Sequence, residues 1–264
     1  MTRDARLLFL ARAVRMFGYG ALGVILVLYL AAAGLGAGEI GLLLSLTLVG
    51  DTVISLYLTT HADQIGRRRT LVIGAMLMAV AGVVFASSTV FVVLLVTATL
   101  GVLSPSGNEV GPFLPIEQSS LTEVTPGDRR TSIYAWYNLT GSIATATGAL
   151  VSGVAVSALV GAGWSELDAY RAVLVGYSVA GLLIVPIARA VSSGVEVPPV
   201  DTSIARRFGL HRSRGVVGRL AALFALDAFG GGLIVQSLLA FWFHQKFGVN
   251  EAVLGGIFFA ANLL

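Results

Sequence analysis

The sequence predicts an all-α protein that crosses a membrane several times, and three observations carry this prediction. Hydrophobic residues make up 56% of the 264 residues and charged residues only 12%, whereas a soluble domain carries about 25% charged residues. The apolar residues form runs of roughly 20 or more, which is the length that an α-helix needs to cross a bilayer. The arginines gather in the short polar stretches between these runs.

The apolar runs divide the chain into predicted helices and domains. The first six runs cover residues 7–32, 39–60, 70–86, 91–121, 132–160 and 168–191. Two further runs follow, at 216–247 and from 251 to the last residue. We predict a six-helix transmembrane domain over residues 1–191, a cytoplasmic linker over 192–214 and the start of a second transmembrane domain over 215–264.

The fourth run is unusual because it contains Pro105, Pro112 and Pro115. Proline removes a backbone donor and breaks the hydrogen-bond ladder of a helix. We therefore expect one long helix with a kink near the middle of the bilayer.

The basic residues predict the orientation of these helices. With a cytoplasmic N-terminus, only Arg171 and Lys246 of the 17 Arg and Lys residues fall away from the cytoplasmic side or the cytoplasmic half of the first helix. Arginine and lysine favour cytoplasmic loops, so this distribution supports both the orientation and the helix count. It also explains the net positive charge, and no nucleic-acid partner is expected.

A parallel internal repeat appears when the chain is shifted against itself by 212 residues. The matching pairs include Phe17 with Phe229, Gly18 with Gly230, Gly20 with Gly232, and Glu39 with Glu251. The run at 216–247 therefore repeats the run at 7–32 in the same orientation, as in one known transporter architecture. Residue 264 pairs with residue 52, so the repeat stops midway through its second helix. We expect the chain to be truncated and unable to transport by itself.

The polar loop between the second and third runs reads T-T-H-A-D-Q-I-G-R-R-R-T-L over residues 59–71. Three adjacent arginines cannot lie in hydrocarbon, so this loop must lie at a membrane surface. Asp63, Gly66, Arg67 and Arg68 match the pattern G-x-x-x-D-[RK]-x-G-[RK]-[RK], while Thr59 and Gln64 depart from it.

With this loop, the six helices, the basic linker and the repeat, the chain resembles a major facilitator superfamily transporter. The resemblance implies an MFS-type six-helix bundle followed by the seventh helix and part of the eighth. It also implies that Asp63, Gly66, Arg67 and Arg68 form a gating loop that latches the two halves in the outward-facing state. The alternative is a solvated loop that only sets the topology. A stretch of family exporters, G-P-x-x-G-G, is matched weakly by Gly148, Ala149 and Gly153, without the proline.

Charged side chains within the apolar runs are the candidates for chemistry, because they are costly in a bilayer. Counting 1.5 Å per residue places Arg15, Asp51, Glu109 and Asp227 near mid-depth. Arg15 and Asp227 occupy equivalent places in the two repeats, so we expect an ion pair between them across a central cavity. A carboxyl group in a low dielectric can exchange a proton near neutral pH, which makes Asp51 and Glu109 candidates for proton coupling. For each of the four, a purely structural ion pair is the alternative.

Two more polar side chains fall near these charges. Asn108 is a candidate for lining the pathway, and Glu117 is expected nearer the cytoplasmic end, paired with loop arginines. The sequence has no H-E-x-x-H, G-x-S-x-G or phosphate-binding loop, no cysteine and only three scattered histidines. We therefore expect no catalytic residues, no metal site and no cofactor, and a protein that is not an enzyme.

These observations predict a secondary active transporter of a small molecule in a bacterial inner membrane. By resemblance, it would work by alternating access driven by protons, with export slightly favoured over import. The alternative is a membrane sensor that does not transport, or an inactive transporter fragment.

Overall fold

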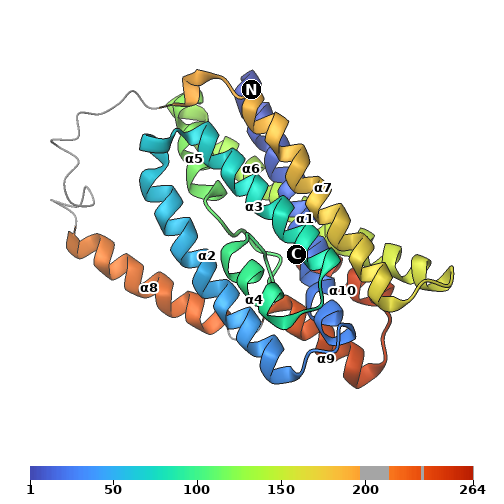
Figure 1. Cartoon of the computed structure of the whole chain (residues 1–264). Coiled ribbons are helices and arrows are strands. Elements are labelled where there is room, and N and C mark those ends of the chain that lie inside the picture. Colours follow the sequence, from blue (N-terminus) through green and yellow to red (C-terminus); the bar gives the residue numbers. More distant parts are fainter. Residues whose placement is uncertain (197–213, 233–234, 264) are drawn as a thin grey trace.

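The structure, a computed structural model, describes residues 1–196, 214–232 and 235–263, and its regular elements in these ranges are helices (Figure 1). The predicted all-α class is confirmed. Four long helices are α1 (Arg3–Ala32), α2 (Ala37–Ile65), α3 (Arg67–Ser87) and α7 (Glu166–Ala190), and a fifth, α6 (Arg130–Gly161), follows the short turn η1 (Gly127–Arg129). By length and composition, α1, α2, α3, α7 and the stretch Gly127–Gly161 can each cross a membrane.

Helix α1 is the centre of the bundle. In its most apolar stretch 83% of the residues are buried, against 28% for α2. It packs against α6 and α7, while α3 packs on α7 and α2 on α4 (Phe91–Leu100). Side chains on α1 therefore meet several other helices, which is the position from which a site can be assembled.

The crossing of α1 and α6 depends on glycine. A Cβ atom added to Gly20 would lie 2.0 Å from the carbonyl oxygen of Thr145, and one added to Gly148 would lie 2.0 Å from that of Phe17. Small residues let two membrane helices approach this closely. These glycines therefore set how near α6 lies to the polar face of α1.

We expect Gly148→Ala to lower the free energy of unfolding by about 1–3 kcal/mol, because the added methyl group forces the two backbones apart. The matched control is Gly176→Ala on α7, where an added Cβ would meet no atom within 4 Å. Thermal unfolding in detergent compares the two variants. Equal midpoints would contradict the close crossing.

The prediction of one kinked helix over 91–121 is wrong. Helix α4 ends at Leu100 and α5 (Phe113–Val124) begins after a non-helical segment, residues 101–112. Gly107 and Gly111 in this segment have φ angles of 70° and 81°, which glycine adopts readily and other residues rarely do. These two glycines, together with Pro105 and Pro112, keep the chain between α4 and α5 from being helical.

The backbone of segment 101–112 is held by side chains of α1 and α7 and by one side chain of its own. The Tyr19 hydroxyl donates to the carbonyl oxygen of Val110 at 3.2 Å, the Tyr177 hydroxyl donates to that of Val102, and Ser104 Oγ donates to that of Asn108 at 2.7 Å. Irregular backbone at membrane depth is tolerated only where protein or trapped water satisfies its polar groups. Segment 101–112 is therefore a non-helical segment beside α1 whose backbone is held by specific hydrogen bonds.

The prediction of one helix over 216–247 is also wrong. The structure has α8 (Arg214–Gly232) and α9 (Gln236–Phe247), with residues 233–234 outside the described part. Residues 215–230 of α8 are all exposed, and in Figure 1 α8 extends away from α9 and from α10 (Glu251–Leu263). The buried packing of α1 is thus not repeated in α8, although the two share a sequence pattern.

Of the predicted linker, the structure describes residues 192–196 and Arg214, with which α8 begins. After α7 the first of these residues form the turn η2 (Ser193–Val195), in which Val195 is buried, and then reach Glu196. Residues 197–213 lie outside the described part of the chain. The predicted domain boundaries stay a prediction.

Candidate functional site

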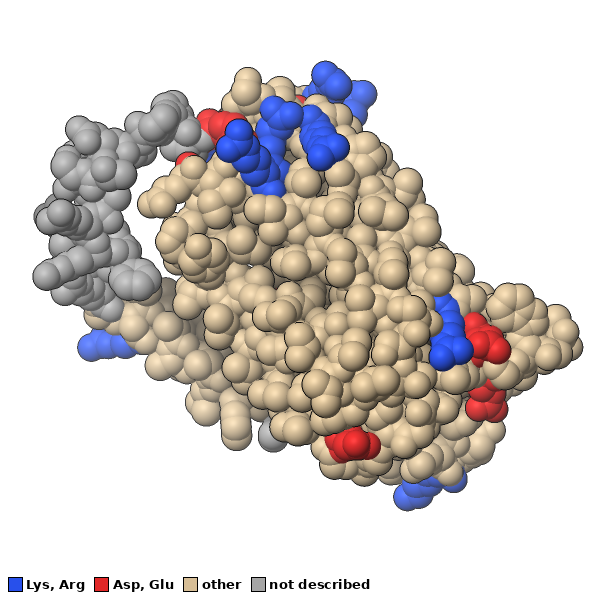
Figure 2. All heavy atoms as spheres, in the orientation of Figure 1, with Lys and Arg blue, Asp and Glu red and all other residues tan. Residues whose placement is uncertain are grey.

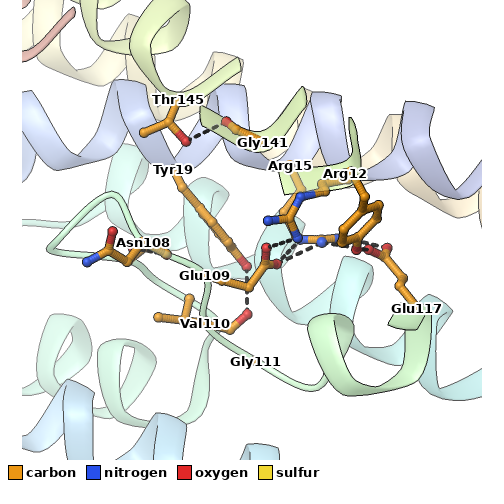
Figure 3. Close-up of polar contacts among 12 residues, drawn as sticks. Arg12, Arg15, Tyr19, Asn108, Glu109, Val110, Gly111, Glu117, Gly141 and Thr145 are labelled. Atoms are coloured by element: carbon orange, nitrogen blue, oxygen red, sulfur yellow. Dashed lines mark hydrogen bonds and ion pairs between the residues drawn. The ribbon is translucent and has the colours of Figure 1, made fainter. Parts of the chain in front are cut away.

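Four charged side chains meet beside α1 (Figure 3). Arg12 and Arg15 lie nearly one turn apart on α1, Glu109 comes from segment 101–112, and Glu117 comes from α5. Arg12 Nη1 donates to Glu109 Oε2 at 2.6 Å, and Arg15 Nε donates to Glu109 Oε1 at 2.7 Å. Arg15 also donates through both terminal nitrogens to the Glu117 carboxylate, at 2.7 and 2.8 Å. Residues far apart in sequence thus form one ion-pair cluster, which we call the α1 charge cluster.

The α1 charge cluster is electrically balanced and almost closed to solvent. The side chains of Arg15 and Glu117 are 0% exposed, and that of Glu109 is 11% exposed. A charge withdrawn from water is costly unless a partner of opposite charge meets it with good hydrogen-bond geometry. Two arginines and two glutamates satisfy this requirement, so a change in charge on one member alters the energy of the others.

Aromatic rings line the same cluster. The Tyr137 hydroxyl on α6 donates to Glu117 Oε2. The Arg12 guanidinium carbon lies 4.0 Å from the centre of the Tyr137 ring, and that of Arg15 lies 4.3 Å from the centre of the Phe113 ring. Cations are attracted to the faces of aromatic rings, so both rings help to hold the arginines in place.

A polar hollow with a volume of about 260 Å³ adjoins the cluster. Its polar lining comes from α1, α6, α10 and segment 101–112: Arg12, Asn108, Glu109, Asn138, Ser142, Thr145 and Asn262. Arg12 is only 6% exposed, and its buried Nε has no hydrogen-bond partner in the described part of the chain. The hollow therefore offers a charged donor and a carboxylate, Glu109, to a small polar molecule or to a proton.

Asp51 lies outside the α1 charge cluster. On α2, its Oδ1 accepts the backbone N–H of Gly111 at 2.8 Å and the Ser55 hydroxyl at 3.3 Å. This geometry gives the carboxylate a structural role, because Gly111 lies in the non-helical segment 101–112 just before α5 begins. Its predicted part in proton coupling stays a prediction.

We expect Asp51→Asn to change the free energy of unfolding by less than about 1 kcal/mol, because the amide oxygen can still accept from Gly111. Asp51→Leu removes the acceptor and is expected to cost about 1–3 kcal/mol. Unfolding in mixed micelles separates the two variants. If both variants destabilise the protein equally, the hydrogen bond to Gly111 is not what Asp51 contributes.

Two predicted pairings are wrong. Asp227 is exposed on α8, and Arg15 is paired with Glu109 and Glu117 instead. The repeat did predict equivalent positions in sequence, but α8 does not occupy the equivalent place in the bundle. Glu117 pairs with Arg15 rather than with loop arginines. The reason is that α5 is a separate helix after the non-helical segment 101–112, and it places Glu117 in the interior beside α1.

The polar loop 63–69 packs against the chain that leaves α7. Gly66, with φ of 99°, joins α2 to α3, and Arg67 Nε donates to Asp63 at 3.0 Å. The backbone N–H groups of Arg67 and Arg68 donate to the two oxygens of Glu196, at 2.7 and 3.2 Å. A carboxylate is favourable at a helix N-terminus. In the described residues, the polar contacts of this loop are thus with its own residues, with the end of α7 and with the chain that follows α7. Its role as a latch between the two halves stays a prediction.

The opposite end of the bundle holds α10 against α6 and α7. The Tyr170 hydroxyl on α7 donates to Glu251 Oε1 at 2.7 Å, and the N–H of Ala252 donates to Ser157 Oγ at 3.0 Å. A Cβ added to Gly153 on α6 would lie 2.1 Å from the carbonyl oxygen of Glu251. The hollow is therefore bounded on this side by a tight contact between α6 and α10.

Comparison with known proteins decides the family. The family model described as Major Facilitator Superfamily matches residues 8–264. The chain belongs to this superfamily. It is also 32% identical over 293 residues to the uncharacterized membrane protein YJR124C of Saccharomyces cerevisiae, an alignment that covers 100% of this chain and 65% of the yeast protein.

Solved structures of superfamily transporters share the fold. A bacterial homologue of the human lysosomal transporter Spinster, in an inward-facing and occupied conformation, matches with a TM-score of 0.66 and 16% identity, over 98% of this chain and 57% of that one. A bacterial homologue of the human drug and peptide transporters PepT1 and PepT2 matches with a TM-score of 0.58 and 14% identity, over 98% and 53%. The chain thus spans little more than half the length of these structures. It is a membrane protein of a transporter family.

Sequence reasoning missed part of this superfamily member's cluster. Arg12 and Tyr137 are not among the predicted site residues, and Glu117 is predicted nearer the cytoplasmic end, paired with loop arginines. A usable signal was present, because two arginines three residues apart in an apolar run require carboxylates of matching number. Glu109 and Glu117 are the two glutamates that the broken fourth run supplies before its last turn.

Proposed function

We propose that the protein to which this chain belongs is a proton-coupled secondary transporter of a small polar molecule, working by alternating access. The observation that carries the proposal is the α1 charge cluster next to the polar hollow. Glu109 touches both, because it binds Arg12 and Arg15 and also lines the hollow. A proton that arrives through the hollow reaches Glu109 first, because the side chain of Glu117 is fully buried and does not line the hollow.

Protonation of Glu109 supplies the proposed coupling. A neutral carboxylic acid no longer balances the charge of Arg12, whose guanidinium then has a net attraction for an acceptor in the hollow. A substrate with a carboxylate, phosphate or carbonyl oxygen can take that place, and its departure returns Arg12 to an ionised Glu109. The Arg12 guanidinium thus binds either the ionised Glu109 carboxylate or the substrate. The substrate binds when Glu109 holds a proton and leaves when Glu109 loses it, which links the two fluxes.

The surroundings of the hollow support alternating access as the proposed mechanism. α10 closes it through contacts with α6 and α7, and a rocking of α10 against these helices would open it on that side. Asp63, Gly66, Arg67 and Arg68 are proposed to latch the opposite side in the outward-facing state, as in the family pattern. We keep the cytoplasmic N-terminus as part of the proposal. The bacterial inner membrane stays a prediction, since the curated relative is a yeast protein.

Flux in proteoliposomes tests the proposal. The whole protein is reconstituted, a pH gradient is imposed, and a panel of small polar solutes is screened for currents on a solid-supported membrane. We expect at least one solute to give a current that protein-free vesicles lack and that a protonophore abolishes. Solute binding without any flux would instead favour the alternative function, a sensor that retains the transporter fold.

A further inference from the structure

A second hollow lies where the polar loop 63–69 meets the end of α7. Its volume is about 760 Å³. Its lining includes Arg68 and Arg69 on α3, Arg189 on α7, and the carboxylates of Asp63 and Glu196. Figure 2 shows basic side chains gathering at this end of the molecule, near the N-terminus and the end of α7.

The two carboxylates in this basic hollow already have partners. Asp63 binds Arg67 at 3.0 Å, and both oxygens of Glu196 accept backbone N–H groups of α3. Arg69 and Arg189 make no ion pair with the described residues. The Arg68 side chain is tied to the carbonyl oxygen of Arg189 at 2.6 Å, and its buried Nε has no partner in the same part of the chain. The hollow therefore has an excess of donors suited to an anion.

The floor of the hollow is apolar and continues down the outside of the bundle. Ile65, Val72 and Ile73 line it beside the arginines. From Arg69 an exposed stripe of apolar side chains runs along one face of α3, at the three- and four-residue spacing of a helix: Ile73, Met76, Val80 and Val83. On α7 the residues that precede Arg189, Leu182 and Leu183, are also exposed. The arginines that can bind an anion thus lie at one end of an exposed apolar surface that can bind hydrocarbon chains.

We propose that this hollow binds an anionic phospholipid of the surrounding bilayer. Its phosphate is held by Arg69, by Arg189 and by the nitrogen atoms of Arg68 that do not bind the carbonyl oxygen of Arg189. Arginine matches phosphate oxygens with two parallel hydrogen bonds, and basic pockets between membrane helices are suited to lipid head groups. The acyl chains lie along the α3 stripe. Because Arg68 and Glu196 join α3 to the chain that leaves α7, the bound lipid holds the gating loop and the linker together.

The test compares lipids and their soluble counterparts on the intact protein in detergent. Thermal unfolding is followed with added phosphatidylglycerol, phosphatidylcholine or inorganic phosphate. We expect phosphatidylglycerol alone to raise the unfolding midpoint. An equal rise with inorganic phosphate would mean a soluble-anion site and would overturn the lipid assignment, and so would an equal rise with phosphatidylcholine.

Variants then locate the site. Arg69→Gln and Arg189→Gln are each expected to weaken phosphatidylglycerol binding roughly fivefold, which corresponds to about 1 kcal/mol for one arginine at a charged membrane surface, while Arg69→Lys retains most of it. The matched control is Arg129→Gln, which removes an exposed arginine outside the hollow. If the double variant Arg69→Gln/Arg189→Gln binds phosphatidylglycerol as the unmodified protein does, the hollow is not the binding site.

Discussion

Replacing Arg15 with methionine is expected to lower the free energy of unfolding by about 3–5 kcal/mol, since removal of one partner leaves a buried charge without compensation. Arg15 is 0% exposed and binds both Glu109 and Glu117. In the variant, Glu117 retains only the Tyr137 hydroxyl. Unfolding by sodium dodecyl sulfate in mixed micelles, followed by circular dichroism, measures the loss.

A double variant separates the charge from the shape of the site. Arg15→Met/Glu117→Met removes both members of the buried pair, and such replacements are often neutral or stabilising. We expect it to be more stable than Arg15→Met alone. Arg129→Met serves as the control, because Arg129 is 74% exposed and pairs only loosely with Asp128 at 3.9 Å. If Arg15→Met costs no more than Arg129→Met, the α1 charge cluster does not hold the bundle together.

The second large effect is expected from Glu109→Gln. Glutamine keeps the shape and the acceptor oxygen of glutamate but cannot exchange a proton, so the link between proton and solute flux is lost. We expect accumulation of the solute against its gradient to vanish, while exchange of labelled for unlabelled solute continues. Radiolabelled uptake and counterflow into the same proteoliposomes measure both quantities.

The control for this experiment is Glu123→Gln. Glu123 lies on α5 like Glu117, but it is exposed and has no hydrogen bond or ion pair in the described residues. Its variant is expected to accumulate solute as the unmodified protein does. Accumulation by Glu109→Gln at the normal level would assign the proton to another group, with Asp51 the next candidate.

The fold class and the family were predictable from sequence because both reflect the physics of the bilayer. Apolar runs of sufficient length must become helices, and arginines such as Arg67 and Arg68 must reach a surface. Gly66 was recognisable from local backbone geometry, because a turn with a positive φ between α2 and α3 favours glycine. These features depend on the solvent and on local backbone geometry, which the sequence displays directly.

The ion-pair partners in the site were not predicted because one error in the predicted local structure misplaced them. Treating residues 91–121 as a single helix at 1.5 Å per residue moved Glu117 toward the surface. In the structure, segment 101–112 is not helical, so α5 carries Glu117 to Arg15. Gly107 and Gly111, which have positive φ in this segment, were visible in the sequence. Their effect depends on Tyr19, Asp51 and Tyr177, which satisfy the freed backbone and come from other helices.

Asp227 shows a different limit. The repeat placed it opposite Arg15 by equating two similar stretches of sequence, but shared residues do not guarantee shared packing. α1 is enclosed by α6, α7 and α9, whereas the described side chains of α8 are exposed. Charge balance was the better guide, because a buried arginine needs a carboxylate within reach and Glu109 and Glu117 supply it.

The reversal of net solute flux is the measurement that tests proton coupling most directly. In proteoliposomes holding the whole protein, the solute gradient at which net flux stops is measured while the pH gradient is varied at fixed membrane potential. Transport of one proton with each solute molecule predicts that this solute gradient shifts about tenfold per pH unit, because one unit corresponds to about 1.4 kcal/mol, and that the shift disappears in Glu109→Gln. A reversal point that ignores the pH gradient in the unmodified protein would contradict proton coupling.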